Sequence, residues 1–231
     1  MRRILFGLAV AAAVATAAQA QVETVVVTGE RASTDTDAPS VTLTERADHL
    51  VTKVKVTCDT RDAERRKDEL RQTLRGMIDE AKRTNSISLS VGDEILTDFT
   101  EKKIDKVMTN DARADTSDAY VVIRTELTKD DSFDGATQRI KDFIARTPKV
   151  GRAEILNELP FNLGIARTER YRSELIRKIA DESKQTASLF GANYDLRIEG
   201  MQRTIQWYQS GPLDLALYIP YTLTIAPRGG Q

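Results

Sequence analysis

The sequence contains few of the side chains that build catalytic and metal centres. Its 231 residues include one cysteine, Cys58, one histidine, His49, and one tryptophan, Trp207. A single thiol cannot close a disulfide within the chain, and one histidine with one cysteine cannot complete a closed zinc site. The stability of the fold must therefore come from a hydrophobic core or from contacts between subunits.

The motifs of nucleophilic and phosphate chemistry are also missing. The sequence contains no Gly-x-Ser-x-Gly elbow and no glycine-rich phosphate loop. His49 and Cys58 are expected on one strand, where nine steps of about 3.3 Å separate them by roughly 30 Å. The two cannot then act as an imidazole–thiolate pair, and the strand pattern predicts that Cys58 is buried. We expect no catalytic, cofactor-binding or metal-binding residues.

Two weaker candidates remain. Asp111, Asp115 and Asp118 share one segment, but the glycine and the terminal glutamate of an EF-hand loop are missing. We interpret this segment as a solvated acidic loop, with weak calcium binding as the alternative. Trp207-Tyr208 indicates hairpin packing with a solvated edge, with a ligand platform as the alternative.

Charge of neither sign predominates. The chain has 34 Lys and Arg against 35 Asp and Glu, which gives a formal net charge of −1. Both signs are spread along the sequence, so no basic patch indicates a nucleic-acid partner. With 40% hydrophobic and 30% charged residues, the composition is that of an ordinary globular protein. After the N-terminal segment, no apolar run is long enough to span a bilayer.

The N-terminal segment has the organisation of a secretory signal peptide. Arg2 and Arg3 precede an apolar run, Ile4–Ala17, and Ala18-Gln19-Ala20 forms a small-x-small cleavage site. We expect residues 1–20 to be removed, by Sec export or alternatively by twin-arginine export. The mature chain would begin at Gln21 in the periplasm, with a net charge of −3 once two arginines are removed from a chain of −1.

The rest of the sequence alternates between strand and helix patterns. Period-two alternation and β-branched residues predict strands over 22–29, 50–58, 87–91, 120–127, 153–159, 194–207 and 213–225. Apolar residues at helical spacing predict helices over Ala63–Ala81, with an N-cap at Asp59 or Thr60, Phe133–Ala145 and Arg170–Gly191. Residues 101–118 are expected to form a loop with one helical turn. Gly200 predicts a bulge or kink, and Pro220 predicts an edge or a bulge.

This order predicts an α+β fold with largely antiparallel sheets and three amphipathic helices packed against them. Residues 21–227 would form one domain, or two subdomains, followed by a frayed tail at 228–231. No transmembrane segment is expected in the mature chain.

The order and spacing of the elements resemble the SIMPL-domain family of bacterial periplasmic and envelope proteins. The residues that carry the resemblance are Val27–Glu30, the three predicted helices, and above all the ending of helix, Gly191 and two strands that finishes at Tyr221–Ile225. Arg31–His49 is a longer polar insertion than relatives usually have. The resemblance implies an α+β fold, a periplasmic or outer-membrane-associated location, homo-oligomers, and a role in envelope maintenance or oxidative-stress defence.

The sequence therefore favours an exported, non-enzymatic envelope protein that associates with itself or with envelope partners. Exposed strand edges, especially around Pro220, are the expected association surfaces. One alternative is a carboxylate-dependent periplasmic hydrolase, which needs two acidic groups converging in an apolar cleft. The other is a carrier of a small ligand or lipid in a cavity between helices and sheet.

Overall fold

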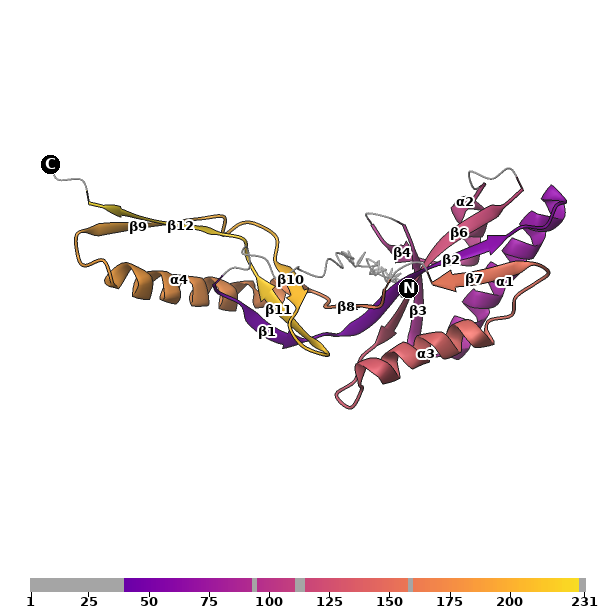
Figure 1. Ribbon diagram of the computed structural model, residues 1–231, viewed down its shortest axis with the longest axis horizontal. Helices are drawn as coiled ribbons and strands as arrows, with labels where there is room; N and C mark the ends of the chain where they lie inside the picture. Colours follow the sequence, from indigo (N-terminus) through magenta and orange to yellow (C-terminus); the bar gives the residue numbers. More distant parts are fainter. Residues whose placement is uncertain (1–39, 93–94, 111–114, 158–159, 229–231) are drawn as a thin grey trace, which may run out of the picture.

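The computed structural model describes residues 40–92, 95–110, 115–157 and 160–228. Three sheets follow one another along an elongated molecule (Figure 1): a seven-stranded sheet at one end, a three-stranded sheet in the middle and a two-stranded sheet at the other end. All strand pairs are antiparallel, which confirms the predicted α+β class. The predicted signal peptide and the predicted strand at 22–29 lie outside the described residues.

The seven-stranded sheet is built around a long central pair. β2 (His49–Cys58) and β6 (Ser117–Glu126) pair along their full length. The path of the sheet is β4-β3-β6-β2-β7, with β5 on β6 and β8 on β2. The bounds of these shorter strands are Ile87–Val91 for β3, Thr97–Asp98 for β4, Met108–Asn110 for β5, Ala153–Asn157 for β7 and Asn162–Gly164 for β8.

Helices α1 (Ala63–Arg83) and α3 (Phe133–Arg146) pack on this sheet. The predicted alternation in β2 is confirmed, because Leu50, Val54, Val56 and Cys58 are fully buried in the core that α1 shares. Lys53 and Lys55 point to the other face of the sheet, where they lie near the Tyr120 ring. One face of the sheet is therefore covered by helices. The other carries polar and charged side chains together with a small buried apolar cluster of Val51, Leu96 and Val122.

The predicted N-cap of α1 was wrong. The helix is capped by Asp62, whose side chain accepts a hydrogen bond from Arg65 N at 2.8 Å. Asp59 instead forms an ion pair with Arg152, and the Thr60 hydroxyl donates to Glu69. Both residues are thus occupied by tertiary contacts, which the local sequence pattern does not encode.

The two long C-terminal strands predicted from the sequence are each divided in two. Residues 194–209 form β9 (Tyr194–Glu199) and β10 (Gln206–Gln209), and residues 214–227 form β11 (Asp214–Tyr218) and β12 (Thr222–Pro227). β10 and β11 belong to the middle sheet, whereas β9 and β12 form the two-stranded sheet. The predicted kink is therefore a complete break between two sheets.

Gly200 and Pro220 lie together at this break. Gly200 has φ of +95°, and a Cβ placed on it would come within 2.7 Å of the Pro220 carbonyl oxygen. Pro220 has no N–H to donate to a ladder, so the pairing cannot run through it. The segments 194–209 and 214–227 thus break at the same level, and β9 and β12 form a sheet separate from that of β10 and β11.

Helix α4 (Arg172–Ser188) follows the short helix η2 (Thr168–Tyr171) and packs on β9 rather than on the large sheet. We call α4, β9 and β12 the arm. The structure contains the three predicted helices and a fourth, the short α2 (Ile104–Val107). It follows η1 (Glu101–Lys103) in the segment where one helical turn was expected. In the described residues, no helix is both long and apolar enough to cross a membrane.

Four short strands were not predicted from the sequence, and the shortest of them, β4, has only two residues. β1 (Leu43–Arg46) lies within the segment interpreted as a polar insertion, and it pairs with β11. β5 and β8 have three residues each. Strands of this length contain too few alternations to be distinguished from loops, and their partners far along the chain determine where they form.

We predict that Gly200→Ala destabilises the protein more than Gly191→Ala. Both glycines have nearly the same positive φ, +95° and +93°, so both substitutions place an alanine at a φ that L residues rarely adopt. Only at Gly200 does the new methyl group also meet another atom, because nothing lies within 4 Å of a Cβ at Gly191. Urea unfolding should show an additional loss of about 1 kcal/mol or more for Gly200→Ala. Equal losses would contradict the close approach to Pro220.

Candidate functional site

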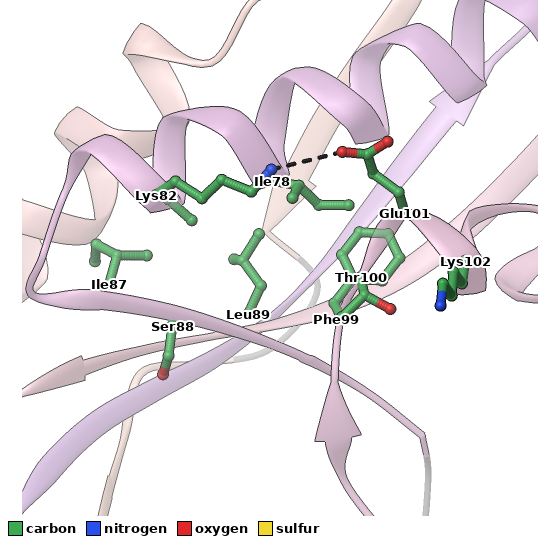
Figure 2. A pocket seen from close by; sticks show the side chains of 10 residues that line it. Ile78, Lys82, Ile87, Ser88, Leu89, Phe99, Thr100, Glu101 and Lys102 are labelled. Atoms are coloured by element: carbon green, nitrogen blue, oxygen red, sulfur yellow. Dashed lines mark ion pairs between the residues drawn. The ribbon is translucent and has the colours of Figure 1, made fainter.

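A groove of about 730 Å³ opens between the last turns of α1 and the edge of β3 (Figure 2). Apolar side chains from the helix, the strand and the following segment form its floor: Ile78, Ala81, Ile87, Leu89 and Phe99. Its rim is polar, with Lys82, Ser88 and the segment 100–102. The volume lies in the range of sites for small ligands.

The groove exists because the strand beside β3 is very short. β4 pairs only with Ser90 and Val91, and the Phe99 N–H donates one further hydrogen bond to the Leu89 carbonyl at 2.9 Å. At Thr100 the chain turns away into η1. Within the described residues no strand pairs with the outer side of Ile87, so this part of the β3 edge faces the groove.

An ion pair spans the rim of the groove. Lys82 Nζ lies 3.5 Å from a Glu101 carboxylate oxygen and 3.1 Å from one of Asp79 (Figure 2 shows the contact with Glu101). The hydrogen bond that Lys82 donates to the Asp79 carboxylate is the main reason why the pKa of Lys82 is raised. Lys82 and Glu101 are each more than half exposed, so their pairing is weak and screened by salt. It can open without a large cost and admit an apolar chain.

The second accessible feature is the far end of the arm. Leu189 and Phe190, directly after α4, are 84% and 54% exposed, and Leu196 on β9 is also exposed. The Phe190 ring packs at a tilt against Tyr194, with ring centroids 5.7 Å apart. In the part of the chain that the structure describes, neither outer edge of the β9–β12 pair has a partner strand. The arm thus combines exposed apolar side chains with open strand edges.

Cys58 is buried, as predicted, and it belongs to a network around Glu69 of α1. The Glu69 carboxylate accepts hydrogen bonds from Thr60 Oγ1 at 2.5 Å, Arg65 Nε at 2.8 Å and the Arg152 N–H at 3.2 Å, and Cys58 Sγ lies 3.5 Å away. These donors, with Thr60 first, lower the pKa of Glu69 to about 2. A Cβ on Gly151 would lie 2.1 Å from the Glu69 carboxyl carbon, so the glycine is required there.

The low pKa of Glu69 limits what this network can do in acid–base chemistry near neutral pH. A carboxyl group that stays ionised down to about pH 2 is poorly suited to exchange a proton near neutral pH. Glu80, also buried on α1, accepts a hydrogen bond from Arg146 Nε at 2.9 Å. It follows Glu69 by eleven residues, or about 16 Å along the helix axis. These two acids therefore cannot converge as a hydrolytic pair.

His49 occupies the opposite end of β2 from Cys58. It is buried, and a Cβ on Gly164 would lie 2.2 Å from its Nε2, so the ring packs directly over the glycine backbone. Burial, and then the charge of Arg124, lower the pKa of His49 to about 4. Its Nε2 has no hydrogen-bond partner among the described residues. The imidazole is therefore uncharged at neutral pH.

The structure describes only some of the remaining candidates from the sequence, and it does not bring those together. Asp111 lies outside the described residues, Asp115 is exposed, and Asp118 is buried 3.1 Å from Lys55 Nζ. Over the described ranges, no group of three or more potential metal ligands occurs. Trp207 and Tyr208 lie in β10, where the Tyr208 ring packs against Tyr218 across the strand pair. This arrangement is the hairpin packing that the sequence favoured.

No family model, curated protein or solved structure matches the chain. The sequence analysis named a cavity between helices and sheet only as part of the carrier alternative, without residues, and it did not anticipate the Glu69 network. One signal for the network was available, because Glu69 lies beside Leu70 and four residues before Thr73 on the helix face that carries the apolar residues. A carboxylate on such a face indicates a buried partner. The groove has no comparable signal, since it depends on where β4 ends.

We predict that His49 makes the protein acid-sensitive between pH 7 and pH 5. The unfolded imidazole takes up a proton near pH 6.5, whereas the folded one does so at about 4, so protonation in this window favours the unfolded chain. The resulting loss of unfolding free energy from pH 7 to pH 5 is about 2 kcal/mol. In His49→Phe, which keeps a ring over Gly164, this loss should be absent from urea-unfolding curves. Identical pH dependence in both proteins would refute the assignment.

Proposed function

We propose that the protein is an exported, non-enzymatic, SIMPL-like envelope protein that associates with itself through the arm. Export is supported by the leader pattern at residues 1–20. A binding role rather than catalysis is supported by the state of the chemically capable groups. Cys58 and Glu69 are engaged with each other, and His49 is buried at the other end of β2. A role in envelope maintenance or oxidative-stress defence remains part of this proposal.

The observation that carries self-association is the small size of the arm. Two strands covered by one helix form a marginal unit, because isolated two-stranded sheets bury too little apolar surface. The large exposures of Leu189 and Phe190 at its end add an apolar surface that water solvates poorly. Contact with a second copy would cover this surface and extend the sheet.

We predict that the mature protein forms concentration-dependent oligomers in light scattering, and that Phe190→Asp weakens them at least tenfold. Ile95→Asp is the matched control. Ile95 is 58% exposed, close to the 54% of Phe190, but it lies beside the seven-stranded sheet instead of in the arm. It should leave association unchanged. A wild-type protein that stays monomeric at high concentration contradicts the proposal.

A carrier function is the second candidate, and the groove beside β3 favours it. Its apolar floor and hydrated rim suit an acyl chain or another small apolar ligand, with Lys82 placed to contact an acidic headgroup. Helix α1 and strand β3, which line the groove, lie at the opposite end of the molecule from the arm (Figure 1), so carrying and association would use separate surfaces.

We predict that the protein enhances the fluorescence of an apolar anionic dye, and that Ala81→Trp reduces dye affinity at least fivefold by filling the groove. Ala145→Trp on α3 is the control, because Ala145 is an exposed helical alanine outside the groove. Equal binding by both variants, or no binding by the wild-type protein, would remove the carrier function. If the dye binds in the groove as expected, native mass spectrometry would identify any natural ligand that copurifies.

A further inference from the structure

The two open edges of the arm differ in charge. β9 carries three charged residues on the face away from α4: Asp195, Arg197 and Glu199. Asp195 forms an ion pair with Arg228, and Arg197 forms one with Glu199. β12 has the sequence Thr-Leu-Thr-Ile-Ala-Pro, without a charged side chain. Charged residues on an edge strand oppose pairing with another chain, whereas an uncharged β-branched edge permits it. The edge of β12 is therefore the better pairing surface.

The hydrogen-bond phase of β12 is fixed by its partner. The Arg228 N–H donates to the Asn193 carbonyl at 2.6 Å, and the register continues inward through Thr224 opposite Arg197. In an antiparallel ladder, alternate residues bond to the same neighbour. The N–H and C=O groups of Thr222 and Thr224 thus point to β9, and those of Leu223 and Ile225 point to the open side.

We propose that β12 pairs antiparallel with β12 of a second copy, with Thr224 opposite the partner's Thr224. In this register Leu223 and the partner's Ile225 exchange both main-chain hydrogen bonds, and the two-fold axis repeats the exchange on the other side of Thr224. A register shifted by two residues toward the C-terminus would place Pro227 opposite Leu223 and lose a bond, because proline has no N–H. The proposal rests on self-association through the arm and specifies the surface that performs it.

The apolar face of the arm supports this pairing. Leu223 and Ile225 lie opposite Ile198 and Leu196, and all four point to the α4 side of the sheet. Because α4 packs on β9, both β12 side chains remain only half-buried. The two-fold axis runs perpendicular to the sheet, so both copies present this face on the same side. A four-stranded sheet β9-β12-β12-β9 would then hold Leu223 and Ile225 of both copies, four apolar side chains in all, between two helices.

The test is a disulfide at the proposed axis, formed in the mature chain with copper–phenanthroline and dissolved oxygen as oxidant. Thr224→Cys places two thiols in a non-hydrogen-bonded antiparallel pair, where the Cα atoms lie about 4.5 Å apart and can be bridged. Thr222→Cys is the control, on the same face of the same strand and likewise exposed. Its two copies would lie more than about 10 Å apart. The wild-type protein, with buried Cys58, controls for the native thiol.

We expect most of the Thr224→Cys protein to run as a covalent dimer on non-reducing gels, at a rate at least tenfold above Thr222→Cys. If both variants cross-link equally or not at all while light scattering shows an oligomer, this pairing is wrong and self-association uses another surface. If the wild-type protein is monomeric in light scattering, both the pairing and the proposed function fail.

Discussion

The close approach of Gly200 to Pro220 determines the shape of the C-terminal half. Without this paired break, residues 194–227 would form one long hairpin in a single sheet. A glycine with positive φ on one strand and a proline without an N–H on the other interrupt the ladder at the same level. Arg203 reinforces the junction, since its guanidinium lies 3.5 Å from the Pro220 carbonyl oxygen. The outer half of the hairpin thus becomes the arm, with only two strands and one helix (Figure 1).

This division separates a self-sufficient unit from one that is incomplete. In the seven-stranded sheet, β2 and β6 are paired on both sides, helices cover one face, and the buried polar groups near Cys58 form hydrogen bonds. In the arm, neither sheet edge is paired with another described strand, and apolar residues at the end of α4 face water. The unpaired strand edges and exposed apolar residues that association would cover therefore lie in the arm. The groove beside β3 is a separate consequence of a short neighbouring strand.

The sequence predicted those parts of the fold in which local pattern and tertiary packing agree. The strand up to Cys58 and the helix from Ala63 were predicted almost to the residue, because each has one buried face and a clear period. β1 was missed since its four residues lie in a polar context and are held by β11. Gly200 and Pro220 were each recognised as interruptions, but their meeting in space is a relation between two strands that no local pattern contains. For Glu69 the local pattern signals burial on the apolar face of α1, but it does not contain the donors Thr60, Arg65 and Arg152.

The central claim is that the edge of β12 is completed by another copy of the chain. Residue-resolved amide hydrogen exchange, measured over a series of protein concentrations, tests it most directly. The account predicts that the amides of Leu223 and Ile225 exchange quickly in dilute solution and become protected as concentration rises. The amide of Thr224, which points to β9, should be protected within the single chain and should change less. Exchange at Leu223 and Ile225 that does not depend on concentration, in a protein that oligomerises, would contradict the account.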